Sequence, residues 1–390
     1  MQALLDHLGR GFEQGCIEFA TTDGRVWTLG RGVPRVRLRL RDAGVLRRML
    51  WNPALRFGEA WMDGEWTPEG CTLREVLAVA TRLWAWLEAR RRGSRWRHLR
   101  ARIEEFNTPL RARRNVAHHY DLDDALYRQF LDADLHYSCA YFARAEMSLE
   151  QAQQEKCALI ARKLDFSPDS AVLDIGCGWG SLALYLAAHH GARVTGITLS
   201  QAQLDLARER ARARGLADRV EFRLEDYRQT QGRYDAIVSV GMFEHVGRPQ
   251  YRTFFAKLAT LLKPDGSALL HTIGRSSPPG VGNPWIRKYI FPGGYIPAAS
   301  EILPAIESSG LVLCDLEVWR RHYARTLAEW QRRFERAELP PTLDARFRRM
   351  WDFYLLASEA SFIHGDLVVF QAQLAHRNDR LPLTRDYLYR

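Results

Sequence analysis

Apolar and polar residues alternate in two different periods along the first quarter of the chain. Alternation with a period of two is typical of half-buried strands, whereas helical spacing places apolar residues three or four positions apart. The expected elements are strands over 15–19 and 33–40, an aromatic, turn-rich segment over 56–66 and a helix over 72–88. Thr72 and Glu75 can form a capping box at the start of that helix. These patterns predict a small mixed domain over residues 1–90.

Farther along, from about residue 150 to 275, helical and strand patterns alternate regularly. The expected helices are 148–164, 181–190, 200–214 and 251–262, and the expected strands are 171–175, 193–197, 220–223, 234–240 and 267–272, with a turn at 263–266. This alternation predicts the α/β class, with a doubly wound, mostly parallel sheet of Rossmann-like type. The Pro- and Gly-rich stretch 276–300 is expected to be a lid loop, and the chain from Ala324 is expected to be mostly helical. We therefore predict a catalytic domain over residues 116–390.

The composition is that of a folded chain with a sizeable core. Of 390 residues, 46% are hydrophobic and 26% are charged, which excludes wholesale disorder. No apolar run approaches the roughly 18–20 residues of a membrane-spanning helix. The first 15 residues are too charged for a secretory signal.

The charge balance is strongly basic. A net charge of +10 indicates a polyanionic partner, either nucleic acid or an anionic membrane surface. Much of the surplus lies in a predicted connector over residues 91–115, which contains Trp96 and is preceded by Trp84 and Trp86. The connector is either a solvated helix between two domains or an interfacial segment, with arginine at lipid phosphates and tryptophan at headgroup depth.

Six cysteines are scattered along the chain, at positions 16, 71, 139, 157, 177 and 314. None forms a CxxC pair, so neither a zinc site nor a disulfide framework is expected. Reduced thiols in a cytoplasmic compartment are the natural expectation, and we predict no metal site.

A glycine-rich turn follows the first strand of the predicted sheet, in the sequence Asp174-Ile175-Gly176-Cys177-Gly178-Trp179-Gly180. Glycines at the carboxyl edge of a sheet let the backbone approach a nucleotide closely. A dinucleotide site needs an acidic residue at the end of the next strand, but that strand ends in Thr198-Leu199-Ser200. The pattern therefore disfavours NAD and favours S-adenosylmethionine (SAM), which has no pyrophosphate.

Several motifs together resemble the cyclopropane-fatty-acyl-phospholipid synthases, a family of SAM-dependent enzymes that includes the mycolic acid cyclopropane synthases. The motifs are 118–121 (HHYD), 137–142 (YSCAYF), 174–180, 198–203, 239–247 (SVGMFEHVG), 271–274 (HTIG) and 285–292 (WIRKYIFP). The segment 58–64 (GEAWMDG) resembles the N-terminal domain of the members that act on phospholipids. The resemblance spans nearly the whole chain.

This resemblance implies a set of SAM-binding residues. They are Tyr137 and Ser138, Asp174 with the cradle glycines Gly176, Gly178 and Gly180, Thr198 and Gln203 at the ribose and adenosine edge, and Asp226 with Tyr227 beside the adenine. Relatives often have Gly-Trp in place of the last pair.

The resemblance also implies the reaction, which is transfer of a methylene group from SAM to a cis double bond of an acyl chain. Attack by the alkene leaves a carbocation, so the site has to be dry and tolerant of positive charge. The aromatic candidates for this role are Tyr120, Tyr137, Tyr141, Phe142, Phe243, Tyr289, Phe291 and Tyr295, for each of which ordinary core packing is the alternative. Ring closure then needs a base, which in relatives is a buried bicarbonate ion.

The resemblance places the holders of bicarbonate at Glu244, His271 and Tyr323, with backbone groups of Cys139 and Ile273. A buried anion needs hydrogen-bond donors, which His271 and Tyr323 can supply. Each of the three side chains has a plain structural alternative, as a bonded core residue. Cys139 is expected to line the site without acting as a nucleophile, since methyl transfer to an alkene needs no covalent enzyme intermediate.

The implied partners are unsaturated phospholipid acyl chains and the anionic inner face of the membrane, with peripheral binding, and a homodimer formed through the N-terminal domain. Three alternatives stay open. One is a C- or N-methyltransferase of the same fold, and another is an inactive lipid-binding scaffold. The third is a nucleic-acid methyltransferase, although the chain lacks the (Asn/Asp)-Pro-Pro-(Tyr/Phe) loop that holds a flipped base. We expect no nucleic-acid partner.

Overall fold

The structure, a computed structural model, describes residues 1–90 and 124–389. The predicted connector 91–115 and the motif 118–121, with Tyr120, lie outside these residues. The described chain divides into two compact units. The first contains residues 1–90, 282–291 and 327–366, and the second contains residues 124–281, 292–326 and 367–389.

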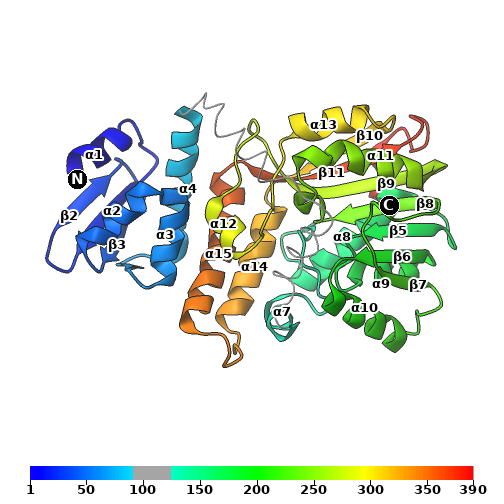
Figure 1. Cartoon of the computed structure of the whole chain (residues 1–390), viewed down its shortest axis with the longest axis horizontal. Coiled ribbons are helices and arrows are strands. Elements are labelled where there is room, and N and C mark those ends of the chain that lie inside the picture. Colours follow the sequence, from blue (N-terminus) through cyan, green and yellow to red (C-terminus); the bar gives the residue numbers. More distant parts are fainter. Residues whose placement is uncertain (91–123, 390) are drawn as a thin grey trace. The chain divides into compact units, whose positions relative to one another are not determined.

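A four-stranded sheet of order β2-β1-β3-β4 forms the start of the first unit (Figure 1). The strands of this sheet are β1 (Cys16–Thr21), β2 (Val26–Leu29), β3 (Arg35–Leu40) and β4 (Trp66–Pro68). The helices of the first unit are α1 (Gln2–Leu8), α2 (Ala43–Trp51), α3 (Pro53–Met62), α4 (Leu73–Arg90), α12 (Pro284–Tyr289), α15 (Ala345–His364) and most of α14 (His322–Glu335). Both predicted strands are present, and β3 alternates as expected, with its arginines exposed and Val36, Leu38 and Leu40 buried. The capping box is also confirmed, because Thr72 and Glu75 bond each other's backbone N–H groups.

The prediction of a turn-rich segment over 56–66 is wrong for most of its length, because these residues are largely helix α3. Pro53 occupies the start of the helix, where its fixed φ favours helix and its missing N–H costs nothing. The helix ends at Met62, before Gly64 takes a positive φ. The turn residues in this segment therefore mark only the end of a helix.

Part of the predicted lid loop 276–300 is helix α12, which packs against α3 within the first unit. Trp285 is 1% exposed and lies against Gly58, where a Cβ atom would be 2.6 Å from the indole nitrogen. Glu59 of α3 accepts hydrogen bonds from Lys288 Nζ at 2.7 Å and from the Tyr289 hydroxyl at 2.9 Å. Residues 282–291 and 327–366, which the sequence analysis assigns to the catalytic domain, thus group with the N-terminal residues.

The second unit is built on a seven-stranded sheet of order β10-β11-β9-β8-β5-β6-β7. Its strands are β5 (Ala171–Ile175), β6 (Arg193–Thr198), β7 (Val220–Leu224), β8 (Tyr234–Val240), β9 (Leu262–Arg275), β10 (Val312–Trp319) and β11 (Leu367–Ala375). The pairs from β7 to β9 are parallel, and β11 runs antiparallel to both of its neighbours. The predicted α/β class with a doubly wound sheet is confirmed.

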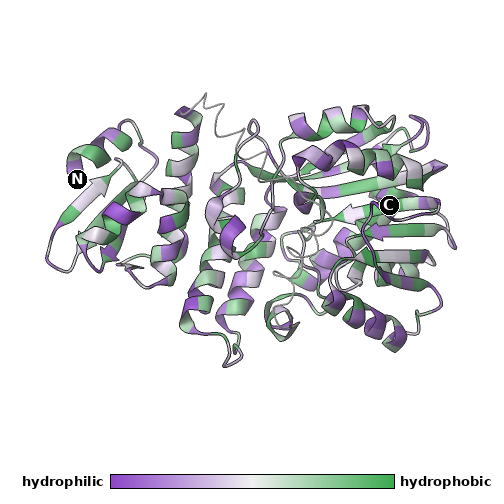
Figure 2. Cartoon of the chain, in the orientation of Figure 1, coloured by the Kyte–Doolittle hydropathy of each residue, from purple (hydrophilic) through white to green (hydrophobic). Residues whose placement is uncertain are grey.

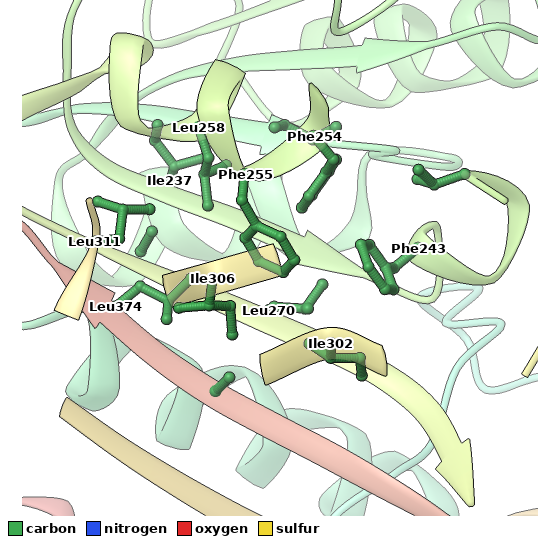
Figure 3. Close-up of a cluster of buried hydrophobic side chains, with 14 of the residues drawn as sticks. Ile237, Phe243, Phe254, Phe255, Leu258, Leu270, Ile302, Ile306, Leu311 and Leu374 are labelled. Atoms are coloured by element: carbon green, nitrogen blue, oxygen red, sulfur yellow. The ribbon is translucent and has the colours of Figure 1, made fainter. Parts of the chain in front are cut away.

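Helices cover both faces of this sheet (Figure 1). They are α7 (Asp124–Phe130), α8 (Leu149–Leu164), α9 (Ser181–His190), α10 (Gln201–Ala213), α11 (Tyr251–Leu261) and α13 (Ala299–Glu307), with short 3-10 turns η1 (Phe243–His245), η2 (Arg248–Gln250) and η3 (Arg385–Leu388). Successive residues of β5 point to opposite faces, so Val172 packs with α8, α9 and α10, whereas Leu173 packs with α11 and α13. Figure 2 shows the central strands largely hydrophobic and the helices two-sided, and Figure 3 shows the core beneath α11 and α13.

Two strands of the second unit escape prediction. The C-terminal part, expected to be mostly helical, also contains β11, and β10 lies just before Ala324. Strand β11 is buried on both faces, with Gln371 and Gln373 on one face and Phe370, Ala372 and Leu374 on the other. The expected turn 263–266 falls inside β9, where a shift of register between the Tyr234–Leu262 and Ala236–Ser267 pairs leaves it unpaired with β8.

Within the described residues, none of the helices combines the length and the apolar character needed to cross a bilayer.

Candidate active site

A deep pocket opens at the carboxyl edge of the large sheet, where β5, β6 and β8 end. It holds about 1270 Å³ of empty space, its open mouth included. In doubly wound sheets this edge is the usual place for a ligand. Nine of the ten predicted SAM-binding residues line it, namely Tyr137, Ser138, Asp174, Gly176, Gly178, Thr198, Gln203, Asp226 and Tyr227.

The tenth residue, Gly180, does not line the pocket and serves packing instead. It begins α9 with φ of 81°, and a Cβ atom there would lie 2.5 Å from the Phe222 ring. Gly178 differs, because it has φ of 54° and no atom lies within 4 Å of where its Cβ would be. The two glycines therefore have separate uses, one holding α9 close to β7 and the other leaving room in the pocket.

Asp174 carries a buried oxygen with no hydrogen-bond partner among the described residues. Burial raises the pKa of this carboxyl to about 7, and the positive charge of Lys156 opposes the rise. Lys156 is 1% exposed, lines the same pocket and donates to Ser138 Oγ at 2.9 Å. The pocket thus has a carboxyl group and an ammonium group in close electrostatic contact.

Sequence reasoning missed Lys156, although a signal was present. The chain has only five lysines, and two of them, Lys156 and Lys163, lie seven residues apart on α8. That spacing puts both on one face of the helix, among Ile160 and Leu164, where an unpaired charge would be costly. Buried lysine at helical spacing therefore indicates a polar site beneath the helix.

The remaining pocket wall combines polar pairs and aromatic rings. Thr198 Oγ1 and Gln203 Oε1 are 2.9 Å apart, which joins the end of β6 to the first turn of α10. Asp226 accepts from the Arg228 guanidinium at 2.8 and 2.6 Å. Tyr227 packs edge-on against Phe254. The structure therefore brings the predicted ribose and adenine residues to one wall.

Glu244 lies just past the end of β8, in η1, and bonds the neighbouring strand. Its Oε1 atom accepts the backbone N–H of Ile273 at 2.6 Å, and its Oε2 atom has no partner among the described residues. Burial raises the pKa of Glu244 to about 7. His271 is two residues before Ile273 on β9, and its carbonyl accepts from Gly241 at 2.9 Å. Glu244 and Ile273 are thus in direct contact, and His271 lies two residues before Ile273 on the same strand.

The other two predicted holders lie on segments that are tied to each other. The Ala140 N–H donates to Thr326 Oγ1 at 3.0 Å, and the Phe142 N–H donates to His322 Nδ1 at 3.1 Å. These bonds fix the chain around Cys139 against the first turn of α14, which carries Tyr323. Burial raises the pKa of the Cys139 thiol far above its usual value, which suits a lining residue. The approach of Cys139 and Tyr323 to Glu244 stays a prediction.

The aromatic candidates separate into different environments. Phe243 and Tyr295 belong to the hydrophobic core shared with α11 and α13, so core packing is their role. Tyr137 lines the pocket, and Tyr141 stacks on His322 at 4.8 Å. Phe142 lies under the Arg325 guanidinium, and Tyr289 and Phe291 belong to the first unit.

Comparison with known proteins agrees with this geometry. The model of the family described as mycolic acid cyclopropane synthetase matches residues 108–372. The chain belongs to this family. It is 38% identical over 339 residues to the cyclopropane-fatty-acyl-phospholipid synthase of Escherichia coli strain K12, covering 86% of each chain.

Two further relatives extend the comparison. A probable fatty acid methyltransferase of Pseudomonas putida is 34% identical over 382 residues, covering 94% of this chain and 95% of the relative. The crystal structure of the mycolic acid cyclopropane synthase CmaA1 with SAH and CTAB superposes with a TM-score of 0.62, 31% identity, and coverage of 67% of this chain and 97% of that one. The chain is therefore an enzyme of the SAM-dependent methyltransferase class.

Proposed function

We propose that the protein transfers a methylene group from SAM to the cis double bond of unsaturated phospholipid acyl chains, giving cyclopropane fatty acids. The observation that carries this proposal is the pairing of two sites in one unit. The open pocket at the glycine-rich turn suits SAM. The buried contact between Glu244 and Ile273, with buried His271 two residues away on β9, suits removal of a proton. Identity with a named phospholipid synthase over most of the chain supports the substrate class.

The pocket residues fit SAM in chemistry as well as in place. The partnerless Asp174 oxygen can accept from the amino group of a bound amino acid, and the neighbouring Lys156–Ser138 pair can meet its carboxylate. The empty space beside Gly178 admits ligand atoms. The Thr198–Gln203 pair offers hydroxyl and amide groups to a ribose or adenine edge. SAM, when bound, supplies the methyl group.

The enzyme's own residues then have to protect a cation and remove one proton. An alkene that has taken the methyl group carries a carbocation, which water would quench. Exclusion of water is served by buried groups near the ends of β8 and β9, including His271, which is 2% exposed. Closing the three-membered ring transfers one proton from the added methyl group to a base.

The cluster around Glu244 fits a small anion, and we assign bicarbonate to it. The fit rests on the buried Glu244 Oε2 atom, which has no hydrogen-bond partner among the described residues while Oε1 binds the Ile273 N–H. With a pKa of about 7, Glu244 can hold a proton and donate it as a hydrogen bond to an anion. The Tyr323 hydroxyl is proposed as a further donor. Bicarbonate, when bound there, would supply the base for ring closure.

We also propose that the protein docks peripherally on anionic lipid and forms a homodimer. The net charge of +10 favours a negative surface. In the first unit, Trp51 at the end of α2 is 90% exposed and follows the exposed Arg47 and Arg48. An exposed tryptophan beside arginines suits the depth of lipid headgroups.

The reaction is tested by mass spectrometry of lipids from cells that express the protein. Phospholipid acyl chains should gain the mass of one CH2 group, and the product should resist mild hydrogenation, as a ring does and an alkene does not. Glu244→Ala and His271→Ala should lose most of this product, whereas Cys139→Ser should retain much of it. Unchanged lipids, or equal loss in all three variants, would count against the proposal.

A second candidate is methyl transfer to the same double bond without ring closure. The similarity to a probable fatty acid methyltransferase favours it. The same lipid extracts decide between the two, because an unsaturated methyl-branched chain takes up hydrogen under mild conditions.

A further inference from the structure

A row of polar residues, buried on β9 and β11 and partly exposed on β10, crosses three strands of the large sheet beside the proposed proton-removal site. The registers place His271 of β9 opposite Gln371 of β11, and Gln371 opposite Glu317 of β10. Lys163 reaches this row from α8 and forms an ion pair with Glu317. Gln371 is fully buried, and Lys163 and His271 are 1% and 2% exposed, so water cannot substitute for their mutual hydrogen bonds.

The direction of these hydrogen bonds is fixed by chemistry. An ammonium group can only donate, and Lys163 Nζ lies 2.6 Å from Gln371 Oε1. The Gln371 amide is therefore oriented with its NH2 group toward His271, where Nε2 of the amide lies 2.9 Å from the ring Nδ1. Turning the amide over would set NH2 against the ammonium group. The ring Nδ1 must consequently accept.

The ring is also held neutral. Burial lowers the pKa of His271 well below its usual value, and the charges of Lys156 and Lys163 lower it further. A neutral imidazole that accepts at Nδ1 carries its single proton on Nε2. The second ring nitrogen is then a hydrogen-bond donor.

We infer that Gln371, oriented by Lys163, is a positioning residue that keeps His271 as the Nε2-protonated tautomer. The inference rests on the proposed function for what the donor serves, since an anionic base bound near Glu244 needs an N–H and is repelled by a lone pair. The tautomer itself follows from Lys163, Gln371 and His271 alone. In the opposite tautomer Nδ1 of His271 would carry the proton, and it would face the Gln371 NH2 group, so that two donors would meet with no acceptor between them.

The tautomer is measured by long-range proton–nitrogen NMR correlation on the full-length protein labelled with nitrogen-15 histidine, with His271→Asn used to assign the signal. The wild-type protein should show a protonated Nε2 and a bare Nδ1. Gln371→Glu, whose carboxylate can only accept, should move the proton to Nδ1 or protonate both nitrogens. A wild-type ring protonated at Nδ1, or a signal unchanged by Gln371→Glu, would overturn the inference.

Gln373 supplies a matched control, because it is equally buried two residues along β11 and bonds Tyr387 and the Lys163 carbonyl instead. Gln371→Met should lower kcat by about 10–100-fold, the usual effect of removing a group that orients a functional residue. It should leave the KM for SAM unchanged, and Gln373→Met should stay near wild-type kcat. Equal loss of kcat in both variants, at matched thermal stability, would mean that the polar row is merely structural.

Failure of the proposed function gives a different result from failure of this inference. If the wild-type ring has the inferred tautomer but His271→Ala retains full activity, the tautomer assignment stands and the proposed role of His271 is wrong.

Discussion

Glu244 shows at the scale of one residue how a site can be built at the expense of stability. One oxygen is bonded to the Ile273 N–H, and the other is buried without a partner among the described residues. The pKa of Glu244 rises from 4.5 to about 7 because ionisation in this environment is unfavourable. The folded protein therefore holds this proton more tightly than the unfolded chain does. The resulting loss of unfolding free energy is small below about pH 4.5, grows as the pH rises toward 7 and is constant at higher pH.

Glu244→Gln should accordingly stabilise the folded protein at high pH while abolishing its activity. The gain in unfolding free energy should approach about 3 kcal/mol near pH 8, from the shift of the pKa at about 1.4 kcal/mol per unit. It should fall to a few tenths of a kcal/mol near pH 4.5, where the wild-type carboxyl is protonated in the folded protein and about half protonated in the unfolded chain. Urea unfolding at the two pH values measures it.

Glu307→Gln is the control for this experiment, since Glu307 is exposed on α13 and should show no pH-dependent difference. A gain for Glu244→Gln that is the same at both pH values would contradict the burial argument.

Helix α8 and the turn before α9 show how elements assemble the site. Helix α8 begins at a capping box formed by Ser148 and Gln151, which fixes where the helix starts. Lys156 and Lys163 share one face of the helix two turns apart, so Lys156 reaches the pocket and Lys163 reaches β11. The turn from 176 to 180 likewise serves two neighbours, the ligand space and the Phe222 ring.

The two glycines of that turn should respond differently to alanine. Gly178→Ala should cost only about 1–2 kcal/mol of stability, the usual penalty for left-handed backbone, but should weaken binding of S-adenosylhomocysteine markedly. Gly180→Ala should destabilise the protein more, because its Cβ meets the Phe222 ring at 2.5 Å. Thermal unfolding and isothermal titration calorimetry distinguish them. If folded Gly178→Ala protein binds S-adenosylhomocysteine as tightly as the wild type does, the turn is not part of the proposed SAM site.

The whole molecule is basic, and we propose that this positive charge helps it to bind a lipid surface. Arginines on α2 and β3 lie at the surface of the first unit. Some are paired, as Arg41 and Arg48 are with Glu65, but the sum over the chain remains +10. An excess of this kind attracts an anionic surface within about 10 Å at 0.1 M salt.

Binding to vesicles should therefore be stronger for anionic than for zwitterionic lipid, and should weaken as salt is raised. Trp51→Ala should reduce flotation with anionic vesicles several-fold, since it removes the 90% exposed ring beside Arg47. Leu383→Ala is the control, because Leu383 is equally exposed but lies in the second unit. Equal flotation with both lipids, or equal loss in both variants, would argue against docking through α2.

Much of the second unit was predictable from the sequence, because its elements carry strong local signals. Strands such as 171–175 are short, largely apolar segments, in this case followed by Gly176. Ser148, Ser200 and Gly191 mark helix ends through their own side chains or backbone. The segment 56–66 misled prediction because Gly58 lies inside a helix, where it packs against Trp285, and Gly64 marks only where that helix ends. Strand β11 was missed although apolar residues alternate with Gln371 and Gln373 over 370–374, a period typical of a strand.

The fold class and the glycine-rich ligand edge could be predicted from local sequence, since both depend on contacts between residues close together in the chain. Which polar groups bond to one another depends on how distant segments pack. Lys163, Gln371 and His271 are separated by about a hundred residues or more, and only strand order and register bring them into one hydrogen-bonded row. The packing role of Gly180 likewise could not be predicted from the sequence, because it depends on Phe222, which is distant in the chain and lies beside it in the fold. Residue type states what a group can donate or accept, but the partner is set by packing.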